Sequence, residues 1–302
     1  MKKNHKLPLS MVLSGGVLLL ILLAALLAPL SPHDPIAVET VQKFLPPSAQ
    51  HLLGTDNFGR DTFTRLLYGG RVSLLVGFLS MLISIVFGTV YGIVSGSSGK
   101  LVDGFMMRIV DIIYTVPDLL IIILLASTLK YPLQSLAEKP GFGWINIIGV
   151  PLISILIVFA LLYWVGMARI VRSQVLTLKE SEYVTAARAL GASGGRIIKK
   201  HLLTNCMGTL IVTTTLQIPS SIFTESYLSF LGLGDPNIMT WGMIIGSNKD
   251  YIMNSWWAVT FPGLTIFLVV LAIGLIGDGI NDAFNPRLRR RCLLYTSPSP
   301  RD

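Results

Sequence analysis

Six mainly apolar stretches recur along this 302-residue chain, and each has about the 20 residues that an α-helix needs to cross a bilayer. They cover residues 11–30, 72–95, 109–129, 147–168, 207–227 and 257–280. Only 13% of the residues are charged, whereas roughly a quarter are charged in a soluble domain. A water-soluble fold of this size cannot hide so much apolar surface. The chain is therefore predicted to be an all-helical membrane protein with six spans.

The first apolar stretch also has features of a secretory signal, because Lys2, Lys3 and Lys6 precede it. However, its apolar run is longer than the roughly 7 to 15 residues of a signal core. Residues 25–28 also do not form an A-x-A site followed by a soluble protein. We interpret residues 11–30 as an uncleaved membrane anchor.

The distribution of basic residues predicts the orientation in the membrane. Six spans place both termini on one side, and 17 of the 24 Lys and Arg residues fall on that side. Seven of them lie in one loop, residues 169–206. The positive-inside rule therefore predicts that both termini are cytoplasmic. The net charge of +8 is explained by topology, and no motif indicates a nucleic acid partner.

This topology divides the chain into five parts. They are a cytoplasmic N-terminus (1–10), an anchor (11–30), an extracytoplasmic loop (31–71), a core of five spans (72–282) and a cytoplasmic tail (283–302). In the extracytoplasmic loop, Phe63, Leu66 and Leu67 fall on one helical face. This pattern favours a short helix on the outer membrane surface over direct contact with a solute.

The long inner loop predicts two short helices. Tyr183, Ala186, Ala187 and Leu190 repeat at helical spacing over residues 180–190, and Gly191 supplies a stop. A second helix is expected after Ser193, with an apolar stripe that includes Leu202 and Leu203. Small alanines on one face suit insertion into a groove on another protein, since they let two backbones approach closely.

Two carboxylates inside apolar stretches are candidates for a solute pathway, because such groups are costly in a membrane. Asp118 follows Pro117 in the third stretch, and Glu225 follows Pro219 in the fifth. Proline interrupts helical hydrogen bonding, which transporters tolerate mainly beside cavities. The alternative for Asp118 is pairing with freed backbone N–H groups or an interfacial position, and Glu225 also has an interfacial alternative.

Gly88, Gly92 and Gly96 recur every four residues, which favours a helix-packing face over a pore lining. No metal site is predicted, because His33 and His51 are isolated and have no further ligands at workable spacing. Cys206 and Cys292 lie far apart and are interpreted as free thiols.

No enzyme activity is predicted for the chain. It has no G-x-x-x-x-G-K-[ST] loop for ATP and no H-E-x-x-H motif. Residues 191–195 match G-x-S-x-G, but they lie in a basic loop rather than on a strand-to-helix turn.

The segment EYVTAARALGASGGRIIKKHLLTN at residues 182–205 resembles the EAA loop of bacterial ATP-binding-cassette importer permeases. Ala186 and Ala187 fall on the paired alanines of that loop, and Gly191 falls on its glycine. Two positions depart from it, since Thr185 stands in place of Glu and Thr204 in place of Pro. The resemblance implies that an ATPase-coupling loop at about 180–205 contains Glu182, Tyr183, Ala186, Ala187, Gly191 and Leu203.

The resemblance extends over residues 51–289. Over this range the chain is similar to the C-type permease subunits of dipeptide and oligopeptide importers. It is carried by HLLGTDNFGRD (51–61), LLYGGRVSLLVG (66–77), MMRIVDIIYTVPDLL (106–120), SFLGLGDPNIMTWG (229–242) and GDGINDAFNPRLR (277–289). Residues 292–302 do not continue the pattern, and we interpret them as a foreign tail, with a genuine tail as the alternative.

Membership of that family implies a type I importer permease in the bacterial cytoplasmic membrane. Its expected partners are a related second permease, two cytoplasmic ATPases that bind the ATP and magnesium, and an extracytoplasmic substrate-binding protein. One alternative is an ion-gradient-driven transporter that uses Asp118 and Glu225. Another is a family importer for nickel or another non-peptide solute.

Overall fold

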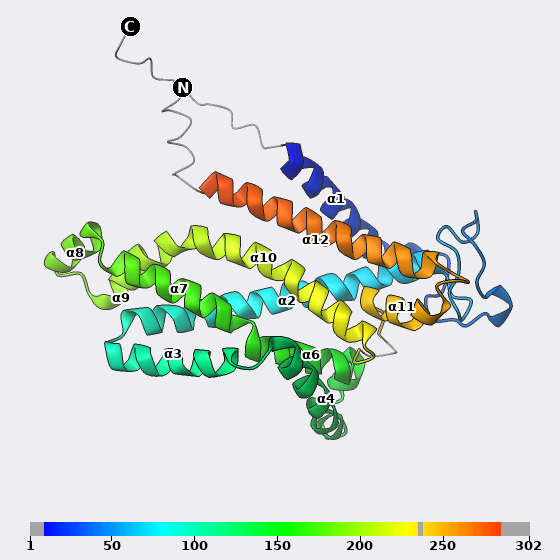
Figure 1. Ribbon diagram of the computed structural model, residues 1–302, viewed down its shortest axis with the longest axis horizontal. Helices are drawn as coiled ribbons and strands as arrows, with labels where there is room; N and C mark the ends of the chain where they lie inside the picture. Colours follow the sequence, from blue (N-terminus) through cyan, green and yellow to red (C-terminus); the bar gives the residue numbers. More distant parts are fainter. Residues whose placement is uncertain (1–8, 235–237, 285–302) are drawn as a thin grey trace, which may run out of the picture.

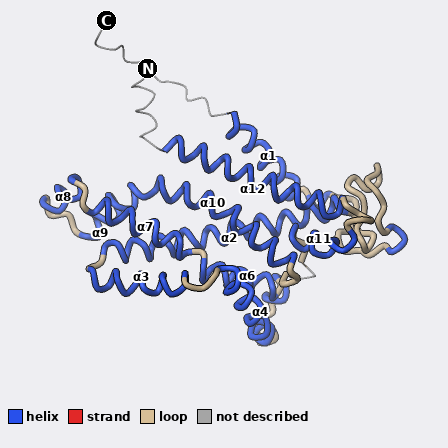
Figure 2. The backbone as a smooth tube through the Cα atoms, viewed as in Figure 1, coloured by secondary structure: helices blue, strands red, loops and turns tan. Residues whose placement is uncertain are grey.

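The computed structural model describes residues 9–234 and 238–284, and helices make up most of this part (Figures 1 and 2). The α-helices are α1 (Leu9–Leu26), α2 (Thr62–Ser97), α3 (Lys100–Tyr114), α4 (Asp118–Ala137), α5 (Trp144–Ile148), α6 (Val150–Leu162), α7 (Trp164–Lys179), α8 (Glu182–Ala189), α9 (Gly194–Ile197), α10 (Leu203–Phe230), α11 (Trp241–Asn248) and α12 (Trp257–Phe284). Shorter turns are η1 (Ala28–Leu30), η2 (Thr40–Gln42), the π-helical η3 (Ile198–Leu202) and η4 (Lys249–Tyr251).

Six helical segments of the described residues are long and apolar enough to cross a membrane, which confirms the predicted all-helical fold. They are Leu9–Leu26, Thr62–Ser97, Asp118–Ala137, Val150–Lys179, Gly194–Phe230 and Trp257–Asp282. Several extend well beyond the predicted apolar windows, because polar residues at their ends continue the helix outside the hydrocarbon layer. The predicted tail after residue 284, including 292–302, lies outside the described residues.

The third predicted span, residues 109–129, is wrong as a single helix. α3 ends at Tyr114, and α4 begins at Asp118 with Pro117 as its N-cap. Proline has no N–H to donate and disfavours helical backbone at the residue before it, so the chain breaks here. The membrane-crossing segment is therefore α4 alone, and α3 is a separate helix beside α2 and α7.

The predicted surface helix around residues 63–67 is also wrong, because this stretch is the beginning of α2. Asp61 caps the helix with its side chain, whose Oδ2 accepts a hydrogen bond of 2.7 Å from the Thr64 amide. From there α2 runs without interruption for 36 residues. At about 1.5 Å per residue it is much longer than the ~30 Å hydrocarbon core, so its first turns extend beyond the bilayer.

α2 is the centre of the bundle. It packs most extensively against α7 and α10, and α10 in turn packs against α12, which contacts α1. In Figure 1, α8 and α9 lie at one end of the molecule, whereas α11 and residues 31–61 lie at the other. The structure therefore separates the candidate coupling loop from the long first loop by the whole length of the bundle.

Gly88, Gly92 and Gly96 allow α2 and α7 to come into close contact. A Cβ atom on Gly92 would lie 2.6 Å from the carbonyl oxygen of Ala168, and one on Gly88 would lie 2.5 Å from the Met167 Cβ. A Cβ on Gly96 would lie 2.8 Å from a methyl group of Val175. The three glycines thus form a face on which one backbone rests against another helix.

Replacing Gly92 with alanine is expected to destabilise the folded protein by about 1 to 3 kcal/mol, because the added methyl group must push backbone away. Gly104→Ala is a matched control, since a Cβ there meets nothing within 4 Å. On that exposed helix, alanine is expected to be neutral or stabilising by up to ~1 kcal/mol. Thermal denaturation of the detergent-purified variants measures the difference. Equal melting temperatures for the two variants would contradict this account of the contact.

Candidate functional site

The segment that resembles a coupling loop forms a helical hairpin of α8 and α9. α8 ends in a Schellman motif in which the Gly191 amide donates to the Arg188 carbonyl at 2.9 Å and the Ala192 amide to the Ala187 carbonyl at 3.0 Å. Gly191 has a φ of +80°, a backbone conformation that glycine adopts without strain. The predicted helix stop at Gly191 is confirmed, and it sets the direction in which the chain turns towards α9.

The predicted loop 169–206 is more helical than expected, because α7 continues to Lys179 and the second helix runs through η3 into α10. Buried apolar residues attach the hairpin to this base. Val184 of α8 and Ile197 of α9 are 0% and 4% exposed, and they pack in one cluster with Leu202 and Val175. The hairpin is therefore a fixed projection of the bundle rather than a loose loop.

The outward face of the hairpin carries most of the residues predicted to couple to an ATPase. Glu182, Tyr183, Ala186 and Gly191 are exposed, while Ala187 and Leu203 are half-buried. Beside them, the Leu190 side chain is 88% exposed, although leucine is normally covered. An exposed apolar residue surrounded by small and charged residues suits contact with another protein.

An ion pair ties α3 to α7 near the same end of the molecule. The Arg172 guanidinium donates two hydrogen bonds of 2.6 Å to the Asp103 carboxylate. Ser95 of α2 donates a third, of 2.5 Å, to the same carboxylate. The hydrogen bonds from Arg172 and, to a lesser extent, the one from Ser95 hold the pKa of the Asp103 carboxyl below its usual value. The helices α2, α3 and α7 are thus held in one arrangement near the hairpin.

Asp118 lines a cavity of about 160 Å³ where α3, α4, α6, α7 and α10 meet. The cavity wall consists of Ile113, Tyr114, Asp118, Leu162, Tyr163, Val165, Gly166, Gln217 and Ser220. Two tyrosine hydroxyls, an amide and a serine hydroxyl accompany the carboxylate there. Such a mixed wall can donate and accept hydrogen bonds and can attract a cation.

Two interruptions of helical structure and one proline inside a helix meet at this cavity. Pro117 separates α3 from α4, Tyr163 separates α6 from α7, and Pro219 lies within α10 between two wall residues, Gln217 and Ser220. Irregular backbone at membrane depth is tolerated where it lines a cavity. Pro219 was expected to interrupt local backbone hydrogen bonding, and α10 continues as a helix through it. Gln217 was not predicted as a cavity residue, although an amide two residues before a proline in an apolar stretch was a signal for it.

The structure separates Glu225 from Asp118. Glu225 is only 1% exposed and is not among the residues that line the cavity. Its Oε1 accepts a hydrogen bond of 2.7 Å from Ser229, and its Oε2 accepts weaker ones from Ser73 and Ser226 at 3.4 and 3.5 Å. Ser73 also accepts from the Trp241 amide, so this network joins α2, α10 and α11. Glu225 therefore contacts neighbouring helices in this structure, and Asp118 is the carboxylate that faces the cavity.

These features define a class of protein. The described residues form six segments that can cross a membrane, three of which, α4, α6–α7 and α10, help to line a polar cavity. A rigid hairpin projects from one end, as expected of a membrane transport subunit. Comparison of the sequence with known families gives a more specific result. Residues 88–290 match the family described as "binding-protein-dependent transport system inner membrane component", and the chain belongs to this family. It is therefore a multi-pass permease subunit of the bacterial inner membrane, as predicted.

Individual relatives cover almost the whole chain. A dipeptide transport system permease protein of Bacillus subtilis (strain 168), DppC, is 42% identical over 91% of this chain and 81% of its own length. A di/tripeptide transport system permease protein of Pseudomonas aeruginosa (strain UCBPP-PA14) is 39% identical over 91% and 88%. The oligopeptide transport system permease protein OppC of Bacillus subtilis is 37% identical over 91% and 84%.

Proposed function

We propose that this chain is one of two permease subunits of an ATP-driven importer for dipeptides or oligopeptides. The exposed, rigidly based α8–α9 hairpin carries the proposal most directly, because it offers a separate ATPase a surface of small and apolar side chains. The names of the three relatives support peptides as the substrate class. The chain contains no P-loop, so ATP and magnesium would be bound by the partner ATPases.

The hairpin end of the molecule is proposed to be cytoplasmic. The described start of α1 and the described end of α12 both point towards that end (Figure 1), which agrees with an even number of spans. Most of the basic residues also belong to that side, as the positive-inside rule requires. The opposite end, with α11 and residues 31–61, would then face the substrate-binding protein.

The second permease subunit is proposed to complete the pathway. Leu119, Leu120 and Leu124 on α4 have exposed fractions of 42%, 62% and 61%, beside the cavity that Asp118 lines. Exposed apolar residues beside an open cavity suit contact with a related chain on the other side of that cavity. The partner would supply the other wall, while the remaining apolar surface faces lipid.

ATP hydrolysis is coupled to transport through a shift of the permease between two conformational states. α7 contributes Val165 and Gly166 to the cavity wall, and its other end, Lys179, leads directly into the hairpin. When ATP closes the ATPase dimer, the two docked hairpins approach each other and the rigid helices attached to them tilt. A tilt of α7 changes the cavity because the same helix forms part of its wall.

Reconstitution tests the proposal. Proteoliposomes would contain this chain with a related permease and two ATPases, with a binding protein outside and ATP inside. Uptake of a radiolabelled dipeptide is expected to require both ATP and binding protein and to survive ionophores that collapse ion gradients. Uptake that persists without ATP but stops with the ionophores would instead identify an ion-driven transporter. Uptake of nickel but not of peptides would contradict the substrate class.

A further inference from the structure

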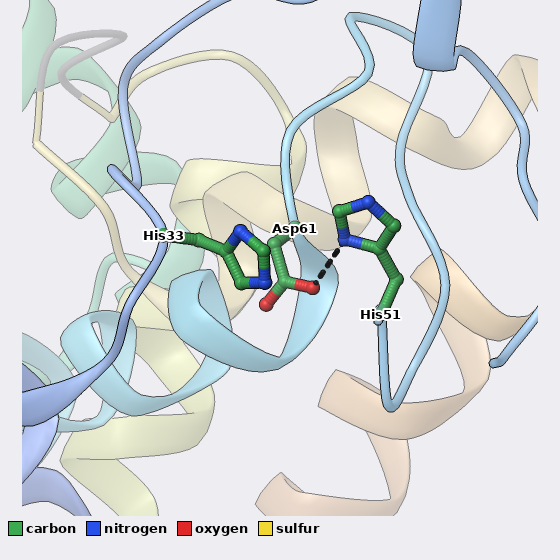
Figure 3. Close-up of side chains that lie close together, drawn as sticks. All are labelled: His33, His51 and Asp61. Atoms are coloured by element: carbon green, nitrogen blue, oxygen red, sulfur yellow. Dashed lines mark hydrogen bonds and ion pairs between the residues drawn. The ribbon is translucent and has the colours of Figure 1, made fainter. Parts of the chain in front are cut away.

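His33, His51 and Asp61 are distant in the sequence but come together in the long first loop (Figure 3). Each offers one ligand atom, and these three atoms all lie within 4.8 Å of one another. His51 and Asp61 are buried, at 6% and 4% exposure, while His33 is half-buried. The turn at residues 54–59 reverses the chain, so that the helix cap Asp61 lies next to His51.

Each imidazole is anchored by a further hydrogen bond. The Nδ1 of His51 lies 3.0 Å from Oδ1 of Asp61, and its Nε2 lies 2.9 Å from Oε1 of Gln42. The Nε2 of His33 lies 3.0 Å from the Gln50 carbonyl oxygen, and the two imidazole rings are 4.8 Å apart between centroids. For His51, this leaves Nδ1 as the ligand nitrogen while Nε2–H is held by Gln42, an arrangement typical of metal-bound histidines.

The carboxylate of Asp61 can serve two purposes at once. Its Oδ2 accepts from the Thr64 amide and caps α2, whereas its Oδ1 faces His51. Binding a metal through Oδ1 therefore leaves the helix cap intact. We propose that His33, His51 and Asp61 bind a divalent transition metal ion, and that zinc is the ion their chemistry favours. Two imidazoles and one carboxylate are a ligand set that zinc uses, with a fourth position open.

The spacing is close to that of a bound ion. Zinc bonds of about 2.0 to 2.1 Å in a tetrahedron place ligand atoms roughly 3.3 Å apart. His51 and Asp61 are already at 3.0 Å, and zinc would replace the proton between them. The ligand nitrogen of half-buried His33 must still come closer to the ligand atoms of His51 and Asp61. A rotation of the His33 side chain can supply this movement.

The open position has space beside it. His33 and Asp61 both line a cavity of about 470 Å³, which is otherwise bounded mostly by apolar residues. These include Leu27 and Leu30, which follow α1, and Phe63 and Leu67 at the start of α2. A water molecule can reach the fourth position from this side. Zinc would therefore link the segment after α1 to the N-terminus of α2.

Zinc binding by the detergent-purified full chain tests the proposal, using a tag without histidines and prior treatment with a chelator. Competition with a zinc-binding chromophore is expected to show one site per chain. His33→Ala and Asp61→Asn are each expected to weaken binding by more than about tenfold. Asparagine retains an oxygen that can cap α2, so Asp61→Asn separates loss of the ligand from loss of the cap. Gln42→Ala is expected to weaken binding about tenfold through the orientation of His51.

His201→Ala is the matched control, because His201 lies in η3 at the other end of the molecule. It is expected to leave zinc affinity unchanged. Zinc is also expected to raise the melting temperature of the wild type but not of His33→Ala, whose own melting temperature without zinc shows that it is folded. Absence of wild-type binding at micromolar zinc would overturn the proposal, as would wild-type affinity in folded His33→Ala.

Discussion

Replacing Ala186 with arginine is expected to abolish ATP-driven uptake while leaving the permease folded. Ala186 lies on the exposed face of α8, so the fold has no need of a small side chain there. A docking groove that accepts alanine at close range cannot accept a long charged side chain. A loss of ~2 kcal/mol in docking free energy, which is typical of a central interface residue, weakens association about thirtyfold.

Ala186→Ser is the matched control, because it keeps the side chain small. Co-purification of the ATPase with each variant measures docking, and uptake in proteoliposomes measures coupling. The serine variant is expected to bind and transport like the wild type, and all three proteins are expected to melt at the same temperature. Wild-type uptake in the arginine variant would show that α8 does not contact the ATPase through this face.

Local sequence signals were sufficient to predict features that depend on the backbone of a few neighbouring residues. Gly191 ends α8 because its φ of +80° suits glycine, and a glycine after a helical repeat is visible in the sequence. The glycines spaced four apart in α2 likewise indicated a close helix contact, and the structure shows α7 in that position. Such features depend on a few neighbouring residues, so they can be recognised without knowing the fold.

The third span shows why apolar windows alone were insufficient. Residues 109–129 are apolar enough to resemble one span, and averaging over the window conceals the break at Pro117. The structure assigns the apolar residues on either side to two helices, α3 and α4. The window could identify membrane-compatible residues, but the position of the break depends on the backbone chemistry of one proline.

The cavity and the cluster in the first loop depend on tertiary structure. Tyr163 and Gln217 are far apart in the sequence, and only the packing of α6, α7 and α10 brings them to the cavity of Asp118. His33 and His51 were interpreted as isolated for the same reason, since their separation of 18 residues matches no metal motif. A folded loop of this length can assemble ligands at almost any spacing, so sequence spacing was a poor guide there.

Asp118→Asn is expected to reduce peptide uptake by more than about tenfold, the equivalent of roughly 1.4 kcal/mol. A peptide carries an ammonium group at its N-terminus, and the exposed carboxylate of Asp118 is the acidic group in the wall of the described cavity. Asparagine has nearly the same size but no charge, so the cavity keeps its shape and loses its attraction for a cation. Asp118 also occupies the first turn of α4, where its interaction with the helix dipole contributes only about 0.3 to 1 kcal/mol.

Glu138→Gln provides the matched control, because Glu138 is the exposed C-cap of the same helix and lies outside the cavity wall. This variant is expected to transport normally. If Asp118 instead acts only on the stability of α4, Asp118→Asn would lower the melting temperature and leave uptake per folded molecule unchanged. Measuring both quantities, together with ATP hydrolysis by the assembled complex, separates these roles. A direct role in the pathway predicts a loss of uptake with hydrolysis and melting temperature close to those of the wild type, because neither the hairpin nor the packing of α7 has changed.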